Sequence, residues 1–250
     1  MNAALFEYAL RLGDDRLVLG HRLSEWCGHA PIVEEDIALA NLALDCIGQA
    51  SQLLELAGEL EGAGRDADAL AFLRDPTQFR NCLLVEQPNG DFAQTIARQV
   101  LFDTAGAHVL GQLAGSKHER LAAIARKAAN EVRYHVRHAR EWWLRLGLGT
   151  DESHARLQAA LDELWPLTRE LVTPDEIDTE LCQVGIGADL RATGERFERE
   201  VGELIAAAKL RRPPHPAFAP SGRRGAHGEH LDHLLSEMQC VARAHPGATW

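Results

Sequence analysis

The 250-residue sequence has few aromatic residues, no excess of positive charge and no long uninterrupted apolar run. Aromatic residues make up 6% of the chain, whereas alanine and leucine are abundant and favour helices over strands. The formal net charge of −11 argues against a nucleic-acid-binding protein. The most apolar run, residues 37–47, is interrupted by Asn41 and Asp45. We therefore expect no membrane-spanning segment and no membrane partner.

The five cysteines are odd in number, and no two of them have Cys-x-x-Cys spacing. We interpret them as reduced thiols, most of them small core residues, in a reducing compartment. The first residues, MNAALFEYALRLGDD, lack the basic start and apolar stretch of a signal peptide. These features predict a cytoplasmic protein. A chain of 250 residues is also long enough to bury one large core.

Long amphipathic segments with short connections dominate the sequence, and no stretch alternates long enough to predict a strand. Four helices are predicted at about residues 5–26, 32–60, 91–113 and 118–146. They have roughly 20 to 30 residues, against about 11 to 12 in the average globular helix. Long helices with short loops and one long crossover are typical of the ferritin-like four-helix bundle. We therefore predict an all-α, ferritin-like four-helix bundle with additional C-terminal helices.

The second half of the chain is expected to add shorter helices to this bundle. They are predicted at about residues 151–171, 189–210 and 229–243, with an irregular linker at 209–228. Thr173, with Pro174 at the first helical position, begins what looks like a capping box. We expect a single domain over residues 1–250, with its core bundle at about 5–146 and accessory helices and tail at about 151–250.

Two stretches, LALDCIGQASQLLE and AANEVRYHVRHAREWW, carry the frame of a metal site without its ligands. Ferritin-like di-iron proteins place one carboxylate on each of two helices and Glu-x-x-His on each of the other two. Here Cys46 and Gln49 occupy one such pair of positions, and Val132 and His135 occupy the other. Asp103 can supply one carboxylate. Two ferrous ions need more compensating charge than this, so we predict a degenerate site that binds no metal.

The residues allow other interpretations of these positions. Asp103 and His135 can pair inside the bundle as a structural contact. Alternatively, Asp103, Glu131, His135 and His138 can form the site of an autonomous metalloenzyme, since the last three are spaced for one helix face. We expect the first arrangement, with no catalytic residue in this chain.

Two other features resemble sites and are interpreted as structural. His227, His230 and His233, near Glu229, have metal-ligand spacing but follow an irregular linker, and we expect no specific metal site there. Cys46 lies on an apolar helix face, where an inert packed thiol is expected.

Several runs resemble the C subunits of 1,2-phenylacetyl-CoA epoxidases over nearly the whole chain. They are RLGDDRLVLGHRLSEWCGHAP, EEDIALANLALDCIGQA, FRNCLLVEQPNGDFAQTIARQ, EVRYHVRHAREWWLRLGLGT, LDELWPLTREL, GEHLDHLLSEMQ and PGATW. The resemblance implies a ferritin-like, non-catalytic structural subunit of a bacterial oxygenase complex for aerobic phenylacetate catabolism.

The same resemblance implies the partners and cofactors of that complex. A related catalytic A subunit holds the di-iron centre and epoxidises the ring of phenylacetyl-CoA, and a reductase component uses NADPH, flavin and an iron–sulfur cluster. The C subunit pairs with the A subunit. Apolar side chains suited to such an interface, some of which must belong to the core, are Phe92, Phe102, Trp142, Trp143 and Trp165.

The run RDPTQFRNCLLVEQPNGD is a candidate contact for the acyl-CoA. Arginines bind phosphate, and a phenylalanine face can stack on a purine. The resemblance implies a substrate-side role for the Gln-Phe-x-Asn run and, on a partial match, for a second segment. The candidate residues are Gln78, Phe79, Arg80, Asn81, Thr179, Glu180 and Leu181. The alternative is an ordinary surface loop whose arginines, Arg74 among them, form ion pairs.

Overall fold

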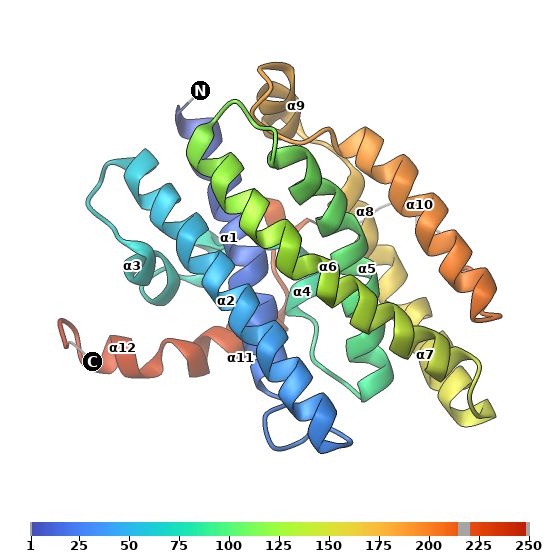
Figure 1. Cartoon of the computed structure of the whole chain (residues 1–250). Coiled ribbons are helices and arrows are strands. Elements are labelled where there is room, and N and C mark those ends of the chain that lie inside the picture. Colours follow the sequence, from blue (N-terminus) through green and yellow to red (C-terminus); the bar gives the residue numbers. More distant parts are fainter. Residues whose placement is uncertain (1, 215–220, 249–250) are drawn as a thin grey trace. The chain divides into compact units, whose positions relative to one another are not determined.

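The computed structural model describes residues 2–214 and 221–248, and all regular structure within these ranges is helical (Figure 1). The prediction of an all-α chain is therefore confirmed. Contacts group the chain into two compact units, residues 1–88 with 220–250 and residues 89–219. The boundary between the units falls inside the core bundle expected at about 5–146, and the C-terminal segment joins the first unit. A single domain over the whole chain stays a prediction.

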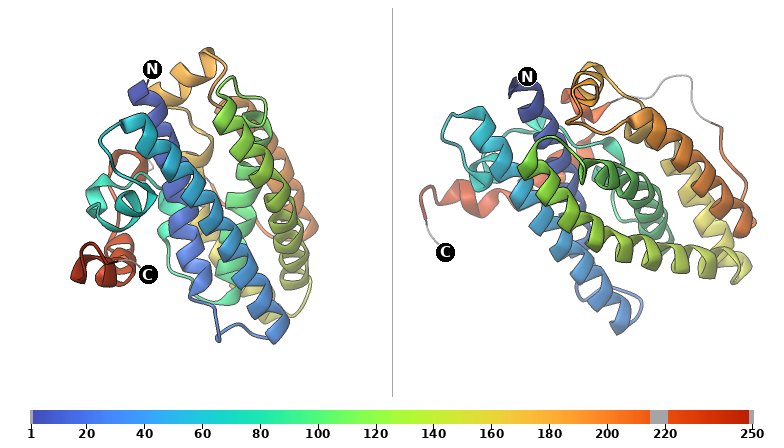
Figure 2. Two further views of the ribbon diagram at one scale, coloured as in Figure 1. Left: turned by 60° about the vertical axis from the view of Figure 1, so that its left-hand side comes forward. Right: turned by 45° about the horizontal axis from the view of Figure 1, so that its top comes forward.

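The first unit is built on an antiparallel helix pair, α1 (Asn2–Ser24) and α2 (Val33–Glu61) (Figure 2). Two glycines of α1 let the pair approach closely. A Cβ added at Gly13 would lie 2.9 Å from Leu54 Cδ2, and one at Gly20 would lie 2.9 Å from Ile47 Cγ1. Helix α1 also buries charged side chains, so its packing needs polar partners as well as apolar ones.

Helix α2 has a well-defined beginning and end. Three acidic residues, Glu34 to Asp36, occupy its first turn, where they interact favourably with the helix dipole. It ends at Gly62, whose φ of 69° is left-handed and whose N–H donates to the Gly58 carbonyl at 3.1 Å.

By length and apolarity, α2 is the one helix in the described part of the chain that could cross a bilayer, although half of its most apolar stretch is buried inside the protein. The expectation that Asn41 and Asp45 exclude any such stretch was therefore too strong.

The segment between α2 and residue 89 folds against the first unit instead of forming an open loop. It contains α3 (Ala67–Phe72), η1 (Pro76–Gln78) and α4 (Leu83–Glu86). All four residues of α4 are buried. The C-terminal segment adds η3 (Gly222–Arg224), α11 (Glu229–Met238) and α12 (Cys240–Ala244) to the same unit.

The second unit is built on another antiparallel pair, α5 (Phe92–Leu113) and α6 (Glu119–Gly147) (Figure 2). The remaining helices of this unit are α7 (Asp151–Leu164), η2 (Trp165–Thr168), α8 (Arg169–Val172), α9 (Glu176–Gln183) and α10 (Leu190–Ala207). The four long helices, as two antiparallel pairs joined by a long crossover, match the ferritin-like fold expected from the sequence.

Two boundaries in the second unit correct the sequence-based prediction. The helix expected at 151–171 stops at Leu164, because Pro166 lacks the N–H that an α-helix needs and its ring crowds the preceding turn. Helix α9 is capped by Asp175, not Thr173. The Asp175 carboxylate accepts from the N–H groups of Ile177 and Asp178, at 2.9 and 3.1 Å.

Aromatic packing fills the core of the second unit. Trp165 stacks on Phe197 with ring centroids 6.2 Å apart, and the Trp143 indole donates to the Leu204 carbonyl at 3.0 Å. Trp143, Trp165 and Phe102 are buried within the protein, so they are not free to form a partner interface. Of the five aromatic residues considered for an interface, Phe92 and Trp142 are half-buried and keep partly accessible surface.

Candidate functional site

The positions of the lost ligands in the first unit are filled by packed side chains. Cys46 and Gln49 lie one helical turn apart on α2, and both are buried. A Cβ built on Gly20 of α1 would lie only 3.3 Å from the Cβ of Cys46, so α1 packs closely over this position. The thiol is therefore enclosed by the helix pair, as expected for a packing residue.

In the second unit, the structure brings Asp103 of α5 together with His135 of α6. The His135 Nδ1 lies 3.9 Å from the Asp103 Oδ2, and both side chains are completely buried. Gln99, one turn earlier on α5, donates to the same carboxylate oxygen at 2.8 Å. The structural pairing expected from the sequence is present, at ion-pair distance but too long for a hydrogen bond.

The residues at these positions do not fit a di-iron centre. Val132, one turn before His135 on the same helix, is fully buried and has no donor atom. The Asp103 carboxylate already accepts a hydrogen bond from Gln99. Within residues 2–214 and 221–248, no three His, Cys, Asp or Glu side chains gather around one point. We derive no metal chemistry for this chain.

The residues of the alternative metal site, Asp103, Glu131, His135 and His138, do not contact one another as a group. Glu131 pairs with Lys127 at 3.8 Å on the outer side of α6. His138 stacks on Tyr134 with ring centroids 6.2 Å apart. Neither joins Asp103 and His135 in a metal-binding group, which argues against the autonomous metalloenzyme.

The candidate acyl-CoA segment is largely buried, and this corrects the idea that Phe79 stacks on a purine. Phe79 is 0% exposed, and the guanidinium of Arg74 lies 4.2 Å from its ring centroid. Arg74 itself donates to Asp14 at 2.9 Å and to the Gln78 carbonyl at 3.0 Å. The ring face and this arginine are therefore used inside the protein.

The neighbouring residues are divided between surface and interior. Gln78 is exposed, but its side chain accepts from the Asp75 N–H at 2.8 Å and so caps η1. Arg80 forms an ion pair with Glu7 at 3.0 Å and is half-buried. Asn81 is buried and donates to Glu86 at 3.0 Å. The alternative interpretation, an ordinary surface loop with ion-paired arginines, is therefore correct about the ion pairs. It is wrong about the surface loop, because the segment is packed against the first unit.

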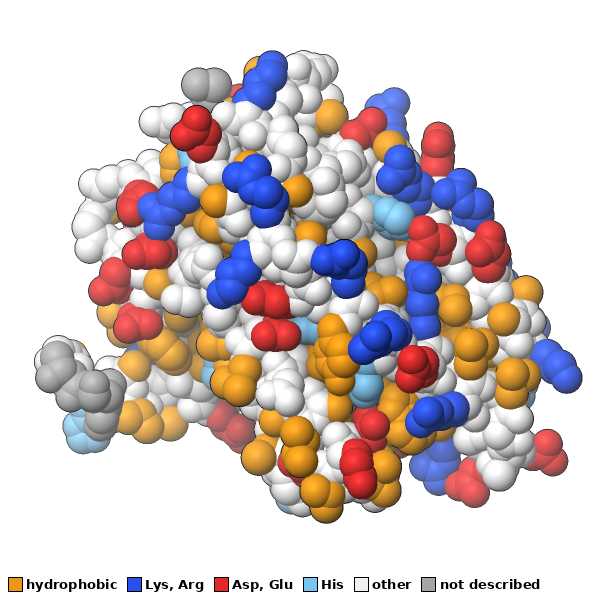
Figure 3. Space-filling view, in the orientation of Figure 1, with side chains coloured by type: hydrophobic (Ala, Val, Ile, Leu, Met, Phe, Trp, Pro, Cys, Tyr) orange, Lys and Arg blue, Asp and Glu red, His pale blue; other side chains and the backbone are white. Residues whose placement is uncertain are grey.

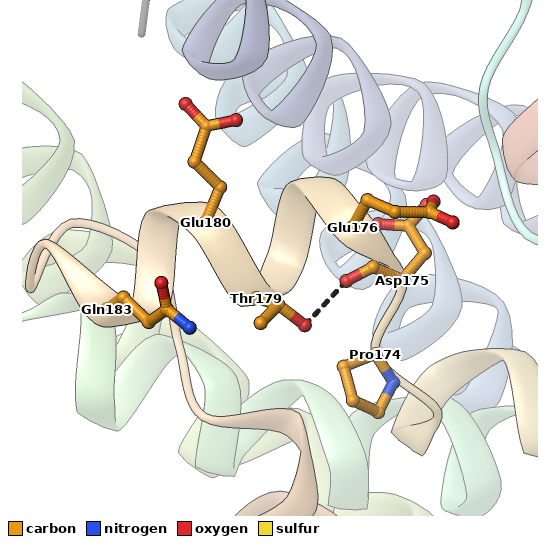
Figure 4. A pocket seen from close by; sticks show the side chains of 6 residues that line it. All are labelled: Pro174, Asp175, Glu176, Thr179, Glu180 and Gln183. Carbon is orange, nitrogen blue, oxygen red and sulfur yellow. Dashed lines mark hydrogen bonds between the residues drawn. The ribbon is translucent and has the colours of Figure 1, made fainter.

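The second candidate segment lies beside a shallow hollow of about 460 Å³ at α9 (Figure 4). The hollow is lined by Pro174, Asp175, Glu176, Thr179, Glu180 and Gln183. Thr179 donates to the Asp175 carbonyl at 2.7 Å, whereas Leu181 is buried away from the hollow in the core. Three carboxylates in the lining repel the phosphates of a CoA ester, so this hollow does not suit that ligand.

A buried polar cluster around Glu86 was missed by sequence reasoning. Its carboxylate accepts from Asn81 and from the Gly228 N–H, the latter at 2.9 Å, and lies 2.8 Å from the His227 Nδ1. The His227 Nε2 lies 3.0 Å from the Phe79 carbonyl oxygen. The only available signal was a histidine in a glycine-rich stretch, since its partners lie more than a hundred residues earlier.

Comparison with known proteins agrees with the all-α fold. The family model described as "Phenylacetic acid catabolic protein" matches residues 1–250. The chain is 50% identical over 246 residues to the C subunit of the 1,2-phenylacetyl-CoA epoxidase of Escherichia coli strain K12. These residues make up 98% of this chain and 99% of that protein. The chain is therefore a member of the phenylacetic acid catabolic protein family.

Proposed function

We propose that this chain is a non-catalytic structural subunit of a 1,2-phenylacetyl-CoA epoxidase complex. Its similarity to an epoxidase C subunit along nearly the full length of both chains supports this function. The observation that carries the non-catalytic role is Val132, a buried apolar side chain where a di-iron protein needs a carboxylate.

The proposal places the redox chemistry in other subunits. The catalytic A subunit holds the di-iron centre and forms the ring 1,2-epoxide of phenylacetyl-CoA, and a reductase supplies electrons through NADPH, flavin and an iron–sulfur cluster. This chain holds none of these groups. Its part is to pair with the A subunit and keep that subunit in its active assembly.

Accessible apolar surface for such pairing is present on α2. Val33, Ile37 and Leu44 are exposed on this helix, Leu44 to 67%, and lie at spacings that share one face. Apolar side chains gather at this end of α2 in the space-filling view (Figure 3). A stable interface of this type typically buries more than about 2,000 Å² and is rich in apolar groups.

The autonomous metalloenzyme is the weaker candidate. It needs Asp103, Glu131, His135 and His138 around one ion, and in the described residues these side chains do not gather in that way.

Co-expression with an epoxidase A subunit tests the structural role. We expect the two chains to co-elute on size-exclusion chromatography, and the pair with its reductase to convert phenylacetyl-CoA. The chain alone should be folded, helical and inactive. The control is the A subunit with reductase alone. Full turnover by that control would rule out an essential structural subunit, and turnover by this chain alone would rule out its non-catalytic role.

A further inference from the structure

The C-terminal segment, residues 221–248, is fixed to the first unit by polar side-chain contacts as well as by the buried leucines of α11, Leu231, Leu234 and Leu235. Arg223 donates to both carboxylate oxygens of Asp15, at 2.9 and 2.8 Å. Gln239 donates to the carbonyl oxygens of Ala71 and Arg74, at 3.1 and 2.9 Å. This segment therefore covers the residues that precede α4.

Close backbone contact accompanies these bonds. A Cβ at Gly222 would lie 2.2 Å from the Asn81 carbonyl oxygen and 3.0 Å from the His227 ring. Gly225 has a φ of 76°, and a Cβ there would lie 2.4 Å from the Thr77 carbonyl oxygen. The glycines thus bring His227 against residues 77–86.

Both ring nitrogens of His227 face acceptors. Nδ1 faces the Glu86 carboxylate and Nε2 faces the Phe79 backbone carbonyl, which cannot donate. The Glu86 carboxylate is held as an acceptor by Asn81 and by the Gly228 N–H. With Glu86 ionised, a neutral imidazole would turn one lone pair towards an oxygen lone pair, so the doubly protonated ring is the form that satisfies both contacts.

The charged side chains around His227 are paired with partners of opposite charge. Arg22 of α1 donates to the backbone carbonyl of Glu86 at 2.8 Å and to that of His230 at 3.0 Å. Its positive charge opposes a second cation nearby, but Glu25 pairs with it at 2.8 Å. From η3, Arg223 is neutralised by Asp15.

Arg80, in the segment that contacts His227, pairs with Glu7 at 3.0 Å, and Glu7 also pairs with Arg11 at 3.5 Å. The carboxylate closest to the imidazole is therefore that of Glu86, and the His227 and Glu86 side chains are almost completely buried.

We propose that protonated His227 is a pH-sensitive clasp that holds residues 221–248 on the segment from Phe79 to Glu86. It acts as an ionic hydrogen bond to Glu86 and a second bond to the Phe79 carbonyl. Loss of the proton breaks one of these bonds and loosens the C-terminal segment. The closed clasp also keeps Phe79 and Asn81 inaccessible to any other molecule.

The direction of the pH effect follows from proton linkage. A free histidine loses its proton near about pH 6.5, and the clasp favours the protonated form in the folded protein. The stabilisation is therefore fully present below about pH 6.5 and is lost as the pH rises above that value. Above about pH 6.5, the equilibrium constant for opening of residues 221–248 should rise by up to about tenfold per pH unit.

Two measurements on the full chain test the clasp. In ¹⁵N-histidine NMR spectra at pH 7, we expect both His227 nitrogens to be protonated. In hydrogen exchange corrected for intrinsic rates, protection of α11 should fall above pH 6.5. The His227→Gln variant should have low protection without this pH dependence, and the control His233→Gln should behave as the wild type.

Either measurement can overturn the proposal. A neutral His227 ring at pH 7 contradicts the assigned protonation state, even if the variant fails to fold. Protection of α11 that is unchanged between pH 6 and 9 contradicts the clasp. A pH effect of equal size in His227→Gln would assign the titration to another group.

Discussion

At the scale of single residues, the second unit holds two carboxylates in different ways. Asp103 is fully enclosed and contacts Gln99 and His135. Glu200 of α10 is partly exposed and is bound by Arg140 and His108. The Asp103 carboxylate is stabilised by its protein partners, whereas solvent also stabilises the Glu200 carboxylate. Removal of a partner should therefore lower the free energy of unfolding more at Asp103 than at Glu200.

Replacement of His135 by alanine should destabilise the protein by about 3 kcal/mol, the low end of the range for breaking a buried pair. The low end is expected because the two side chains are 3.9 Å apart. Urea denaturation measures the change in the free energy of unfolding. The exposed His29 serves as a control, and His29→Ala should have little effect. If His135→Ala assembled normally and abolished epoxidation, His135 would have a role beyond structure.

Glu200 should contribute stability that depends on pH. Burial alone would raise the pKa of Glu200, but hydrogen bonds and charge interactions with Arg140 and His108 outweigh it and lower the pKa. The contribution is therefore present above about pH 4.3 and is lost as the pH falls through the lower folded pKa. At pH 7, Glu200→Gln should cost about 0.5 to 1 kcal/mol, since the pair is partly exposed. The difference between the variant and the wild type should shrink as the pH falls below about 4.3, and an undiminished difference at pH 3 would contradict this origin.

At the scale of elements, the long helices could be predicted because their segments are rich in helix-forming residues and end at turns that contain glycine or proline. The predicted 91–113 and 118–146 differ from α5 and α6 by one residue at each end or less. The short elements were harder to predict, because their ends depend on which side chain reaches which N–H. Thr173 and Asp175 are both plausible caps, and only the folded backbone decides between them.

The cap of α9 gives a direct test of that choice. Asp175→Ala removes the acceptor of two N–H bonds and should cost about 1 kcal/mol. Thr173→Ala, two residues earlier at an exposed position, should change stability by less than about 0.5 kcal/mol. Chemical denaturation of both variants, with hydrogen exchange within α9, measures the difference. A larger loss of stability in Thr173→Ala than in Asp175→Ala would instead support Thr173 as the cap.

At the scale of the whole molecule, the lost ligands were readable from the sequence but the polar clusters were not. Val132 and Gln49 are visible departures from the Glu-x-x-His pattern, because that pattern has a fixed local spacing. The contacts of Asp14 with Arg74 and of Glu86 with His227 join residues 60 and 141 positions apart. No periodicity encodes such distant pairs, so the candidate loop at 74–91 looked exposed.

We predict that the purified chain contains well below one iron atom per molecule, because Val132 and its neighbours supply too few ligands. Val132→Glu would restore Glu-x-x-His on α6 beside Asp103 and should raise the affinity for a divalent metal ion. It should also destabilise the metal-free protein, since position 132 is fully buried. Elemental analysis and denaturation with and without Fe²⁺ measure both effects. Stoichiometric iron in the wild type would contradict the prediction.

The discontinuous first unit imposes an order on biosynthesis. Asp15 and Glu86 leave the ribosome early, but Arg223 and His227, which bind them, are separated from them by 208 and 141 residues. Domains tend to fold as units while the chain is being made, so residues 89–219 can emerge completely before the first unit has its last helices. Until translation is nearly finished, two buried carboxylates lack their cationic partners. Premature termination after residue 219 should therefore leave a nascent chain whose first unit is a target for chaperones and proteases.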